Sequence, residues 1–471
     1  MAEVKEQGCP HCRRLQTEIE ALKARQAEIE AELARARKHS GNSSKPPSSD
    51  IVKPPKDPPA GNHKDKKRKR GGQPGHPHQQ RPLFAAEDVT LVKDYRYDDC
   101  PCCGGGLEDC AQPPKIQQHI EIKDIPVAIS EHRRIAQYCP QCDKIHYRSF
   151  PQHLVKAGLV GPRLTALVGF FKGACHMSFS TIRKFFRDVM GVPISRGHLA
   201  KLVAKVSDSL YDPYDELLKL LPEEGHLNVD ETGHKDLGDR LWTWCFRASL
   251  YTLFKISPSR GSKVLVEVLG QEFNGILGCD YFSAYRKYMK NFNVLVQFCL
   301  AHFIRDVKFL SEHPNADNRA YGDMLLGYLR ELFGIIHRRD QYASEQDFRA
   351  ALKRVRDTLV GEAILAAPET REAGNLAKRF VHHYDSYFRF ISEPGVEPTN
   401  NLAEQAIRFV AIHRRLTQGT RGQTGQTWCE RIWTAVVSCA QQGRSIFEFL
   451  CETVTAHFRG EAAPSLLPNS S

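Results

Sequence analysis

The part of the sequence that most restricts the fold lies between His226 and Ser257, where three β-prone segments follow one another at close spacing. Their sequences are HLNVDETG, RLWTWCFRAS and YTLFKIS. Short runs of β-branched and aromatic residues bounded by turn residues are typical of strands, and short connections join antiparallel neighbours. We therefore expect three successive antiparallel strands.

The segments that follow alternate between helix and strand. SRGSKVLVEVLG predicts a helix, GILGCDYFSAY a fourth strand that ends at Asp280, and FNVLVQFCLAHFIRDVKFL a fifth strand that continues into a helix. Three antiparallel strands followed by alternating helices and strands are the element order of a ribonuclease H-like α/β fold. In that order Asp230, on the first strand, lies beside Asp280.

Asp230 and Asp280 define a candidate metal site. With reference pKa values of about 4, both carboxyl groups should be ionised at neutral pH and should repel each other until divalent cations bind. Oxygen ligands suit Mg²⁺ or Mn²⁺. Two such ions can activate a water or a 3′-hydroxyl and stabilise the leaving oxygen of a phosphodiester displacement.

A third carboxylate is commonly delivered to such a site by a helix packed on the sheet, and Glu404 in EPTNNLAEQAIRF is the candidate. The same stretch also fits a capping box, in which Glu404 bonds back to the amide of Asn401. The two interpretations are compatible, because a cap fixes where the helix starts and where Glu404 points. Glu231, which follows Asp230, should face the opposite side of its strand.

Two CxxC pairs upstream of the strands predict a structural zinc site. CPCC supplies Cys100 and Cys103, and CPQC supplies Cys139 and Cys142. The two-residue spacing selects Cys103 over Cys102. Four thiolates complete a tetrahedral Zn²⁺ site with no open coordination position. Such an ion would hold a small domain together and would not take part in catalysis.

Residues 12 to 33 carry mostly apolar side chains alternately three and four residues apart, interrupted by Gln26, with charged residues between them. This heptad pattern predicts a short coiled coil and self-association, with a solvated single helix as the alternative. The pair Cys9 and Cys12 has no second pair nearby. Two chains aligned by the coiled coil could join their pairs around one Zn²⁺; two reduced thiols are the alternative.

The chain from Lys38 to Arg81 is rich in Pro, Ser and Gly and has almost no large apolar residues, which predicts a disordered linker. A basic cluster within it suits phosphate contacts by a flexible arm, with a solubilising linker as the alternative. The formal net charge of +11 also favours a polyanionic partner such as nucleic acid. The cluster consists of Lys64, Lys66, Lys67, Arg68, Lys69 and Arg70.

Residues 162 to 208 are predicted to form three helices. Between the last two, Gly191 can end one helix and Ser195 can cap the next. The arrangement resembles a helix-turn-helix, whose second helix binds the DNA major groove; a plain helical subdomain is the alternative. Side chains expected to face DNA are those of Arg196, His198, Lys201 and Lys205, and those expected to face inward are those of Leu199, Leu202, Val203 and Val206.

A chain of 471 residues exceeds the usual size of one hydrophobic core, so the predicted fold class is multidomain α+β. The first residues lack the apolar region of a secretion signal, and no apolar stretch is long enough to span a bilayer, so a cytoplasmic protein without membrane contact is expected. The expected parts are an N-terminal coiled coil (1–40), a disordered basic linker (41–85), a zinc-binding domain (86–155), a helix-turn-helix-like domain (156–212), a ribonuclease H-like catalytic domain (220–450) with a helical insertion at about 312–392, and a C-terminal tail (451–471).

Several motifs occur in a defined order over nearly the whole chain: SGNSSKPPSSD, RKRGGQPGH, the paired cysteines, NVDETG, GCDYFSAY, CLAHFIRD and EPTNNLAEQAIR. In these motifs the sequence resembles bacterial transposases of the insertion-sequence-66 family, whose catalytic domain is of the DDE type. The resemblance implies that Asp230, Asp280 and Glu404 are the catalytic residues and the ligands of Mg²⁺ or Mn²⁺.

The resemblance implies an enzyme that binds the ends of a mobile element and cleaves and joins DNA at the bacterial nucleoid. Its expected partners are double-stranded DNA (terminal inverted repeats and target), further copies of the chain in a dimer or higher multimer, and accessory proteins of the same element. A ribonuclease H-like nuclease without strand transfer is the alternative enzyme. A non-catalytic DNA-binding regulator derived from a transposase is the alternative outside enzymes.

Other residues near the expected site have candidate roles. His302 and Arg305, in CLAHFIRD, are candidates to assist catalysis and to hold a phosphate; core polar bonding or a surface ion pair is the alternative. Trp242 and Trp244 are interpreted as sheet-packing residues, with base stacking as the alternative. Basic residues after Glu404 that are assigned loosely to DNA contacts are Arg408, Arg414, Arg415 and Arg421.

Overall fold

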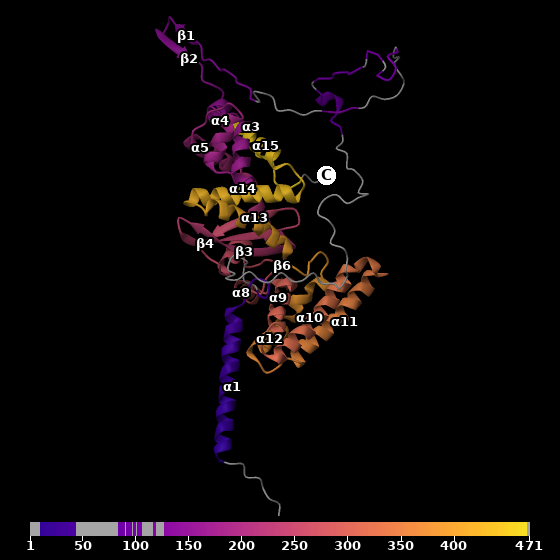
Figure 1. Ribbon diagram of the computed structural model, residues 1–471. Coiled ribbons are helices and arrows are strands. Elements are labelled where there is room, and N and C mark those ends of the chain that lie inside the picture. Colours follow the sequence, from indigo (N-terminus) through magenta and orange to yellow (C-terminus); the bar gives the residue numbers. More distant parts are fainter. Residues whose placement is uncertain are drawn as a thin grey trace, which may run out of the picture. The chain divides into compact units, whose positions relative to one another are not determined.

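The computed structural model describes residues 10–43, 83–89, 91–96, 98–99, 101–105, 116–118 and 127–468. The chain forms two compact units, one of Lys56–His132 and one of Met1–Pro55 together with Arg133–Ser471. Nearly all of the helices and strands belong to the larger unit (Figure 1). The predicted basic arm, Cys9 and Cys100 lie outside the described residues.

A five-stranded mixed sheet lies at the centre of the larger unit. The first three strands pair antiparallel, whereas β6 pairs parallel with β3, and β7 pairs parallel with β6. The predicted strands are confirmed, and so is the expected position of the fourth strand beside the first. In the order β5-β4-β3-β6-β7, the strands are β3 (His226–Asp236), β4 (Asp239–Arg247), β5 (Thr252–Ser257), β6 (Ile276–Cys279) and β7 (Leu295–Phe298).

Helices cover both faces of this sheet (Figure 1). On one face lies α8 (Ser283–Phe292), whose Tyr285 ring contacts Trp244 of β4. On the other face α13 (Asn401–Thr417) and α14 (Gln423–Gln441) pack against the sheet, and Trp433 of α14 contacts Phe254 of β5. Both faces are apolar because the sheet is buried between two helical layers.

The outer edge of the sheet is closed by α14. The side chains of Glu430, Thr434 and Ser438 accept hydrogen bonds from the backbone amides of Ile256 (2.7 Å), Phe254 (3.1 Å) and Thr252 (3.0 Å) of β5. A step of four residues along a helix is about 6 Å, close to the step of two residues along a strand. The spacing of these acceptors on α14 therefore matches the amides of an edge strand, which have no strand partner.

A helical subdomain precedes the sheet, and its three predicted helices are confirmed. Ser195 caps α5 by accepting a hydrogen bond from the amide of His198 (3.1 Å), and Gly191 has a positive φ of 66° after α4. The residues expected to face inward on α5 are all buried. The helices are α2 (Gln152–Ala157), α3 (Pro162–Gly173), α4 (Phe179–Asp188) and α5 (Arg196–Ser209), and α6 (Tyr211–Leu220) leads into the sheet.

The predicted C-terminal tail is wrong over most of its length. The helix α15 (Ile446–Arg459) packs against α3 and α5, and its residues Leu450, Val454 and Phe458 are buried. Leu466, beyond the helix, is also buried, with 1% of its surface exposed. The reason is the apolar stripe of α15, which completes the core of the helical subdomain.

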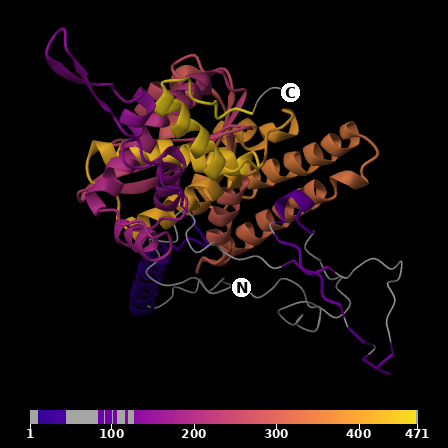
Figure 2. The same cartoon turned by 90° about the horizontal axis from the view of Figure 1, so that it is seen from above.

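The predicted helical insertion is present between the last strand and α13. Each of the three helices that follow α9 begins with a side-chain cap that accepts a hydrogen bond from a backbone amide. The capping residues are Asn315, Ser344 and Thr370. Figure 2 shows these helices, in orange, lying together beside the sheet. The elements are α9 (Leu300–Ser311), α10 (Ala316–His337), α11 (Glu345–Leu365) and α12 (Arg371–Phe388).

The N-terminal helix α1 (Pro10–Ala36) covers the segment with the heptad pattern. Its apolar residues are exposed, among them Leu22 at 70% and Ile29 at 52%. The end of the helix is tied to the insertion by an ion pair between Arg35 and Glu372 (3.0 Å). The expected helix is thus present, and its association with a second copy stays a prediction.

One segment of the described residues, Gln152–Gly173, has the length and composition of a membrane span, with a mean hydropathy of 1.4. The segment consists of α2 and α3, which residues 158–161 separate. In α3, Ala166 and Val168 are fully buried in the protein core. These residues of α3 therefore pack in the helical subdomain, whereas Val155 and Leu159 of the same segment are exposed.

Candidate active site

Asp230 and Asp280 lie at the centre of the sheet. Asp230 is on β3, and Asp280 directly follows the neighbouring strand β6. Pairing of Asn228 with Gly278 brings the two strands together just before these positions. Asp230 Oδ1 accepts a hydrogen bond from the amide of Glu231 (2.9 Å), and Asp280 Oδ1 accepts one from the amide of Phe282 (2.9 Å). Backbone amides therefore fix the orientation of both carboxylates.

Glu404 reaches the same site from α13. The structure corrects the predicted capping box: the N-cap is Asn400, and neither Asn400 nor Glu404 makes a side-chain cap. The Asn400 side-chain amide instead donates a hydrogen bond to the carbonyl of Val229 (2.8 Å). The backbone amide of Asn400 donates one to Cys299 Sγ (3.1 Å). This tertiary bond uses the side chain that a local cap would need.

The three carboxylates interact electrostatically. Burial raises the pKa of Asp230 well above its usual value, and the charges of Glu231, Asp280 and Glu404 raise it further. Burial also raises the pKa of Asp280, and the negative charge of Glu404 contributes to this rise. Three crowded acids on different elements are therefore held without enough local positive charge, which is the situation that a bound cation relieves.

His302 and Arg305 of α9 contact Glu404. Arg305 Nη2 lies 3.2 Å and His302 Nδ1 lies 3.4 Å from Glu404 Oε1. Burial, together with the Arg305 charge, lowers the pKa of His302 to about 3, so the imidazole is neutral at physiological pH. Both residues lie beside Glu404: Arg305 donates a hydrogen bond to its carboxylate, whereas the neutral His302 is close to it without a hydrogen bond.

Two sets of residues could hold a metal. Among the described residues, ligand atoms of Cys299, His302 and Glu404 all lie within 4.8 Å of one another, and this mixed sulfur, nitrogen and oxygen set suits Zn²⁺. Burial, however, raises the pKa of the Cys299 thiol and so opposes the thiolate that Zn²⁺ needs. The oxygen ligands of Asp230, Asp280 and Glu404 suit Mg²⁺ or Mn²⁺.

Glu231 forms a network that the sequence analysis missed. Its Oε1 accepts a hydrogen bond from Arg260 Nε (2.9 Å) and forms an ion pair with Arg260 Nη2 (2.8 Å). Its Oε2 accepts a hydrogen bond from the Tyr285 hydroxyl (2.5 Å). Burial and the Asp280 charge raise the pKa of Glu231 to about 7, whereas Tyr285 and Arg260 oppose this rise. Its contact with α8 agrees with the expected orientation away from the Asp230 face.

Among the predicted DNA-contacting residues that the structure describes, His198 is half-buried and the others fall into two groups. The ammonium group of Lys205 donates hydrogen bonds to the carbonyls of Lys156 (2.7 Å) and Ala157 (2.9 Å), and the Arg414 guanidinium bonds to Thr232 Oγ1 (3.3 Å) and to a neighbouring carbonyl of β3. These two residues thus hold helix ends and strands, contrary to expectation. Residues that are exposed, as DNA contacts require, are Arg196, Lys201, Arg408, Arg415 and Arg421.

Cys139 and Cys142 lie in a β-hairpin formed by β1 (Ala136–Cys139) and β2 (Lys144–Tyr147). Hydrogen bonds from Cys142 lower the pKa of the Cys139 thiol, which favours a metal-binding thiolate. His146 Nε2 lies 3.3 Å from Cys142 Sγ and was not predicted. Cys103 is exposed and belongs to the smaller unit.

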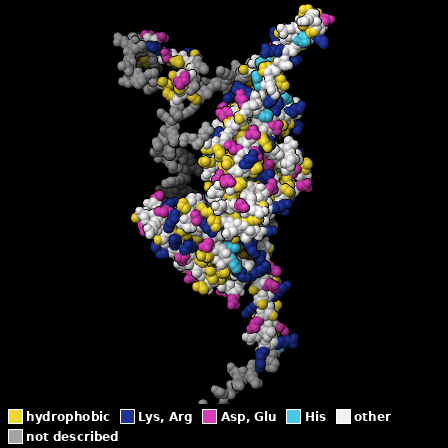
Figure 3. Space-filling model, turned by 180° about the vertical axis from the view of Figure 1, so that it is seen from behind, with side chains coloured by type: hydrophobic (Ala, Val, Ile, Leu, Met, Phe, Trp, Pro, Cys, Tyr) yellow, Lys and Arg dark blue, Asp and Glu magenta, His cyan; other side chains and the backbone are white. Residues whose placement is uncertain are grey.

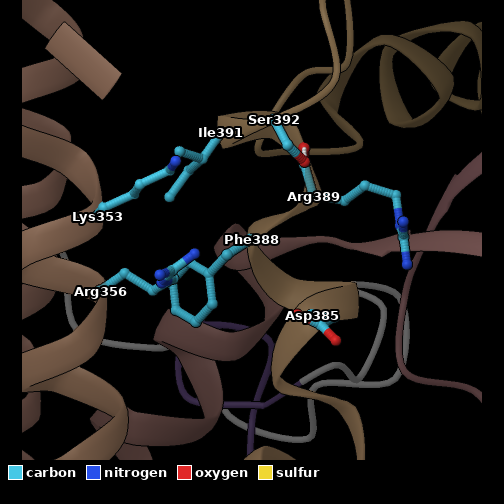
Figure 4. A pocket seen from close by; sticks show the side chains of 7 residues that line it. All are labelled: Lys353, Arg356, Asp385, Phe388, Arg389, Ile391 and Ser392. Atoms are coloured by element: carbon cyan, nitrogen blue, oxygen red, sulfur yellow. Dashed lines mark hydrogen bonds between the residues drawn. The ribbon is translucent and has the colours of Figure 1, made fainter. Parts of the chain in front are cut away.

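Basic residues also gather on the helical insertion, where Figure 3 shows Lys and Arg side chains on the surface. A cavity of about 280 Å³ there is lined by Lys353 and Arg356 of α11 and by Arg389 and Asp385 at the end of α12 (Figure 4). None of the three clustered carboxylates lines it. The cavity is therefore separate from the acidic site.

The sheet, its helices and the acidic cluster define a mixed α/β protein with a candidate metal site. Comparison with known proteins is more specific, because the profile described as Transposase IS66 family matches residues 157–427. The chain belongs to this family. A second profile, of a family of unknown function, matches residues 3–82.

Two curated relatives come from Sinorhizobium fredii (strain NBRC 101917 / NGR234), and neither is characterised. The uncharacterized protein y4qI is 22% identical over 433 residues, which cover 85% of this chain and 78% of the relative. The uncharacterized protein y4hP is 22% identical over 380 residues, which cover 72% of this chain and 67% of the relative. The similarity to these proteins therefore extends beyond the matched family profile.

Proposed function

We propose that the protein is a DNA transposase of a bacterial insertion sequence, with a ribonuclease H-like catalytic domain of the DDE type. The observation that carries this proposal is the electrostatic cluster of Asp230, Asp280 and Glu404, which come from β3, the end of β6 and α13. Membership of a transposase family supports the DNA reaction. The order of the strands supports the fold assignment.

In the proposed reaction, Asp230, Asp280 and Glu404 hold Mg²⁺ or Mn²⁺. The bound ions supply an activated water or 3′-hydroxyl and neutralise charge on the phosphate. The chain's own contribution is placement. Backbone amides orient Asp230 and Asp280, the Asn400 bond fixes the start of α13, and Arg305 holds Glu404 near the other acids.

DNA binding is assigned to the exposed basic residues and to the arm from Lys64 to Arg70. Arg196 and Lys201 are the exposed basic pair on α5, the second helix of the proposed helix-turn-helix. The proposed partners are the terminal inverted repeats of the element, target DNA, further copies of the chain joined through α1, and accessory proteins of the same element. The proposed location is the bacterial cytoplasm, and the cysteine pairs are proposed to bind a structural Zn²⁺.

The test uses the full chain and a duplex that carries an element end, with Mg²⁺ present. Cleavage followed by joining of the 3′-end supports a transposase, cleavage alone indicates a nuclease, and binding without cleavage indicates a regulator. Asp280→Asn and Glu404→Gln should abolish cleavage and preserve DNA binding, whereas Glu397→Gln, an exposed acid before α13, should have no effect. Cleavage that survives Asp280→Asn contradicts the assignment.

Metal binding has an independent readout. Mn²⁺ should raise the midpoint of thermal unfolding of the intact protein, because an ion bound only by the folded state stabilises it by mass action. Asp280→Asn should remove this shift, and Glu397→Gln should retain it. An equal shift in Asp280→Asn would place the ion elsewhere.

A further inference from the structure

We propose that Arg260 binds the phosphate that is cleaved, and that Glu231, Trp242 and Phe282 hold its guanidinium in position. This inference rests on the proposed function, since it assigns a substrate contact at the same site. Arg260 lies in the loop between β5 and α7 (Lys263–Leu269), outside the motifs that identified the acids.

Three contacts fix the guanidinium group of Arg260. Its Cζ lies 4.5 Å from the centroid of the Trp242 ring and 4.0 Å from that of Phe282, distances at which a cation is attracted to an aromatic ring. Its Nε and Nη2 both bond Glu231 Oε1. A side chain with four rotatable bonds is thus confined to one position before DNA arrives.

The held guanidinium retains free donors. An arginine has five N–H groups, and the bonds to Glu231 use one on Nε and one on Nη2. Within the described part of the chain, Nη1 and the second N–H of Nη2 have no hydrogen-bond partner. The Arg260 side chain is 40% exposed although Glu231 is only 1% exposed, so the free edge of the guanidinium is open to solvent.

The contacts of Arg260 connect it to residues that neighbour both aspartates in the sequence. Glu231 directly follows Asp230 on β3, and the amide of Phe282 orients Asp280. Arg260 therefore touches both of the segments that carry the aspartates. Its positive charge opposes the rise in the pKa of Asp280 that burial causes, which agrees with this placement.

A phosphodiester is the group that this arrangement fits. The planar guanidinium group can donate hydrogen bonds to two oxygens of a phosphate, and these bonds strengthen as negative charge develops on the oxygens. In the proposed step the oxygen of a water or a 3′-hydroxyl bonds to phosphorus and gives up its proton to solvent, and the bond from phosphorus to the leaving 3′-oxygen breaks. That oxygen takes up a proton from solvent, and Arg260 donates hydrogen bonds to a non-bridging oxygen without transferring a proton. Glu231 is then a positioning residue and not a metal ligand.

The competing explanation is that Arg260 only neutralises the buried Glu231. A charge-matched pair of variants separates the two. Arg260→Met removes the guanidinium, and the double variant Arg260→Met with Glu231→Gln removes both charges. If Arg260 is only a counterion, the double variant regains the cleavage rate of Glu231→Gln; if Arg260 binds phosphate, the double variant stays as slow as Arg260→Met.

The matched control is Arg240, whose Cζ lies 4.8 Å from the same Trp242 ring and which has no carboxylate partner among the residues that the structure describes. Single-turnover cleavage at saturating DNA should fall by a factor on the order of 10²–10³ in Arg260→Met, a typical loss for one donor to a developing charge. Affinity for DNA should change only a few-fold, because the loss concerns the reacting phosphate. Arg240→Met should cleave at the rate of the intact protein.

Arg260→Lys keeps the proposal testable if Arg260→Met does not fold. Lysine retains the charge for Glu231 but lacks the planar fork, so cleavage should still fall by roughly tenfold or more. Normal cleavage by Arg260→Lys, or rescue in the double variant, overturns the proposal. An intact protein that does not cleave DNA at all instead overturns the proposed function, and the inference with it.

Discussion

The side-chain amide of Asn400 donates a hydrogen bond of 2.8 Å to the carbonyl of Val229, the residue before Asp230. Asn400 is the N-cap of α13 and is 1% exposed. One buried side chain therefore joins the helix that carries Glu404 to the strand that carries Asp230. This bond therefore helps to set the distance between these two acids.

Replacing Asn400 by Ala should separate the two acids. The Val229 carbonyl would lose its partner in a buried position, and an unsatisfied buried acceptor costs about 1–3 kcal/mol. We expect a lower midpoint of thermal unfolding and cleavage that is roughly tenfold to a hundredfold slower, since small displacements at an active site are costly. Asn401→Ala, at the exposed neighbouring position, should change neither; equal effects of both substitutions would show that α13 only needs a polar start.

Periodicity and element order predicted most of the fold from the sequence. Short β-prone runs at close spacing identified β3 to β5, the alternation with helices identified β6 and β7, and the position of Asp280 at the end of the fourth strand placed it beside Asp230. The cap of α13 was misplaced by one residue, because a local pattern does not show that Asn400 bonds to a strand 171 residues away. The Arg260–Glu231 pair was missed for the same reason.

Basic residues show the same limit of sequence patterns. The helical spacing of α5 placed Lys205 on the same polar face as Lys201, but the α2 carbonyls that bind its ammonium group come from a distant segment. Arg414 likewise bonds to β3. The helical spacing identifies the side chains that point away from the core of the helix's own subdomain. Tertiary packing then determines whether such a side chain is exposed to solvent or bonds to a carbonyl of another segment.

The cysteine hairpin provides a second prediction. Cys139→Ser should reduce the zinc content of the purified protein from one ion per chain to none, since loss of one thiolate opens a structural site. The unfolding midpoint of the larger unit should stay the same, because the side chains of β1 and β2 are almost all exposed. Zinc content is measured by atomic absorption.

Cys102→Ser is the matched control for the zinc prediction. Cys102 is exposed and neighbours Cys103, but it lacks the two-residue spacing. Its substitution should leave zinc bound. Zinc that remains in Cys139→Ser would point to other ligands, among which His146 is the first to examine because of its distance of 3.3 Å from Cys142 Sγ.

Stability should fall in mild acid because of His413. Burial, together with the charges of the nearby His176, Lys172 and His234, lowers the pKa of this histidine to about 3. The unfolded chain, with a histidine pKa of about 6.5, therefore binds more protons than the folded chain between these values. Stability is complete above pH 6.5 and is lost as the pH falls toward 3, by about 2 kcal/mol at pH 5 from this group.

The measurement is the midpoint of thermal unfolding between pH 7.5 and pH 5 for the intact protein and for His413→Gln. The substitution should flatten the dependence on pH, although not completely, because burial also lowers the pKa of His234, to about 4. His337→Gln, at an exposed position in the last turn of α10, is the control and should leave the slope unchanged. A slope that His413→Gln does not alter would contradict the assignment.

The exposed apolar residues of α1 predict that the chain self-associates. Leu22 lies in the middle of the heptad pattern and is 70% exposed, so it gains burial only from another helix. Leu22→Asp should shift the full chain from dimer or higher multimer to monomer in sedimentation equilibrium, because a coiled coil of about three heptads cannot accept a buried charge. Ala24→Asp introduces the same acid outside the apolar stripe and should preserve association. If the intact protein is already a monomer, the apolar residues of α1 belong to a solvated single helix and the chains must meet through another surface.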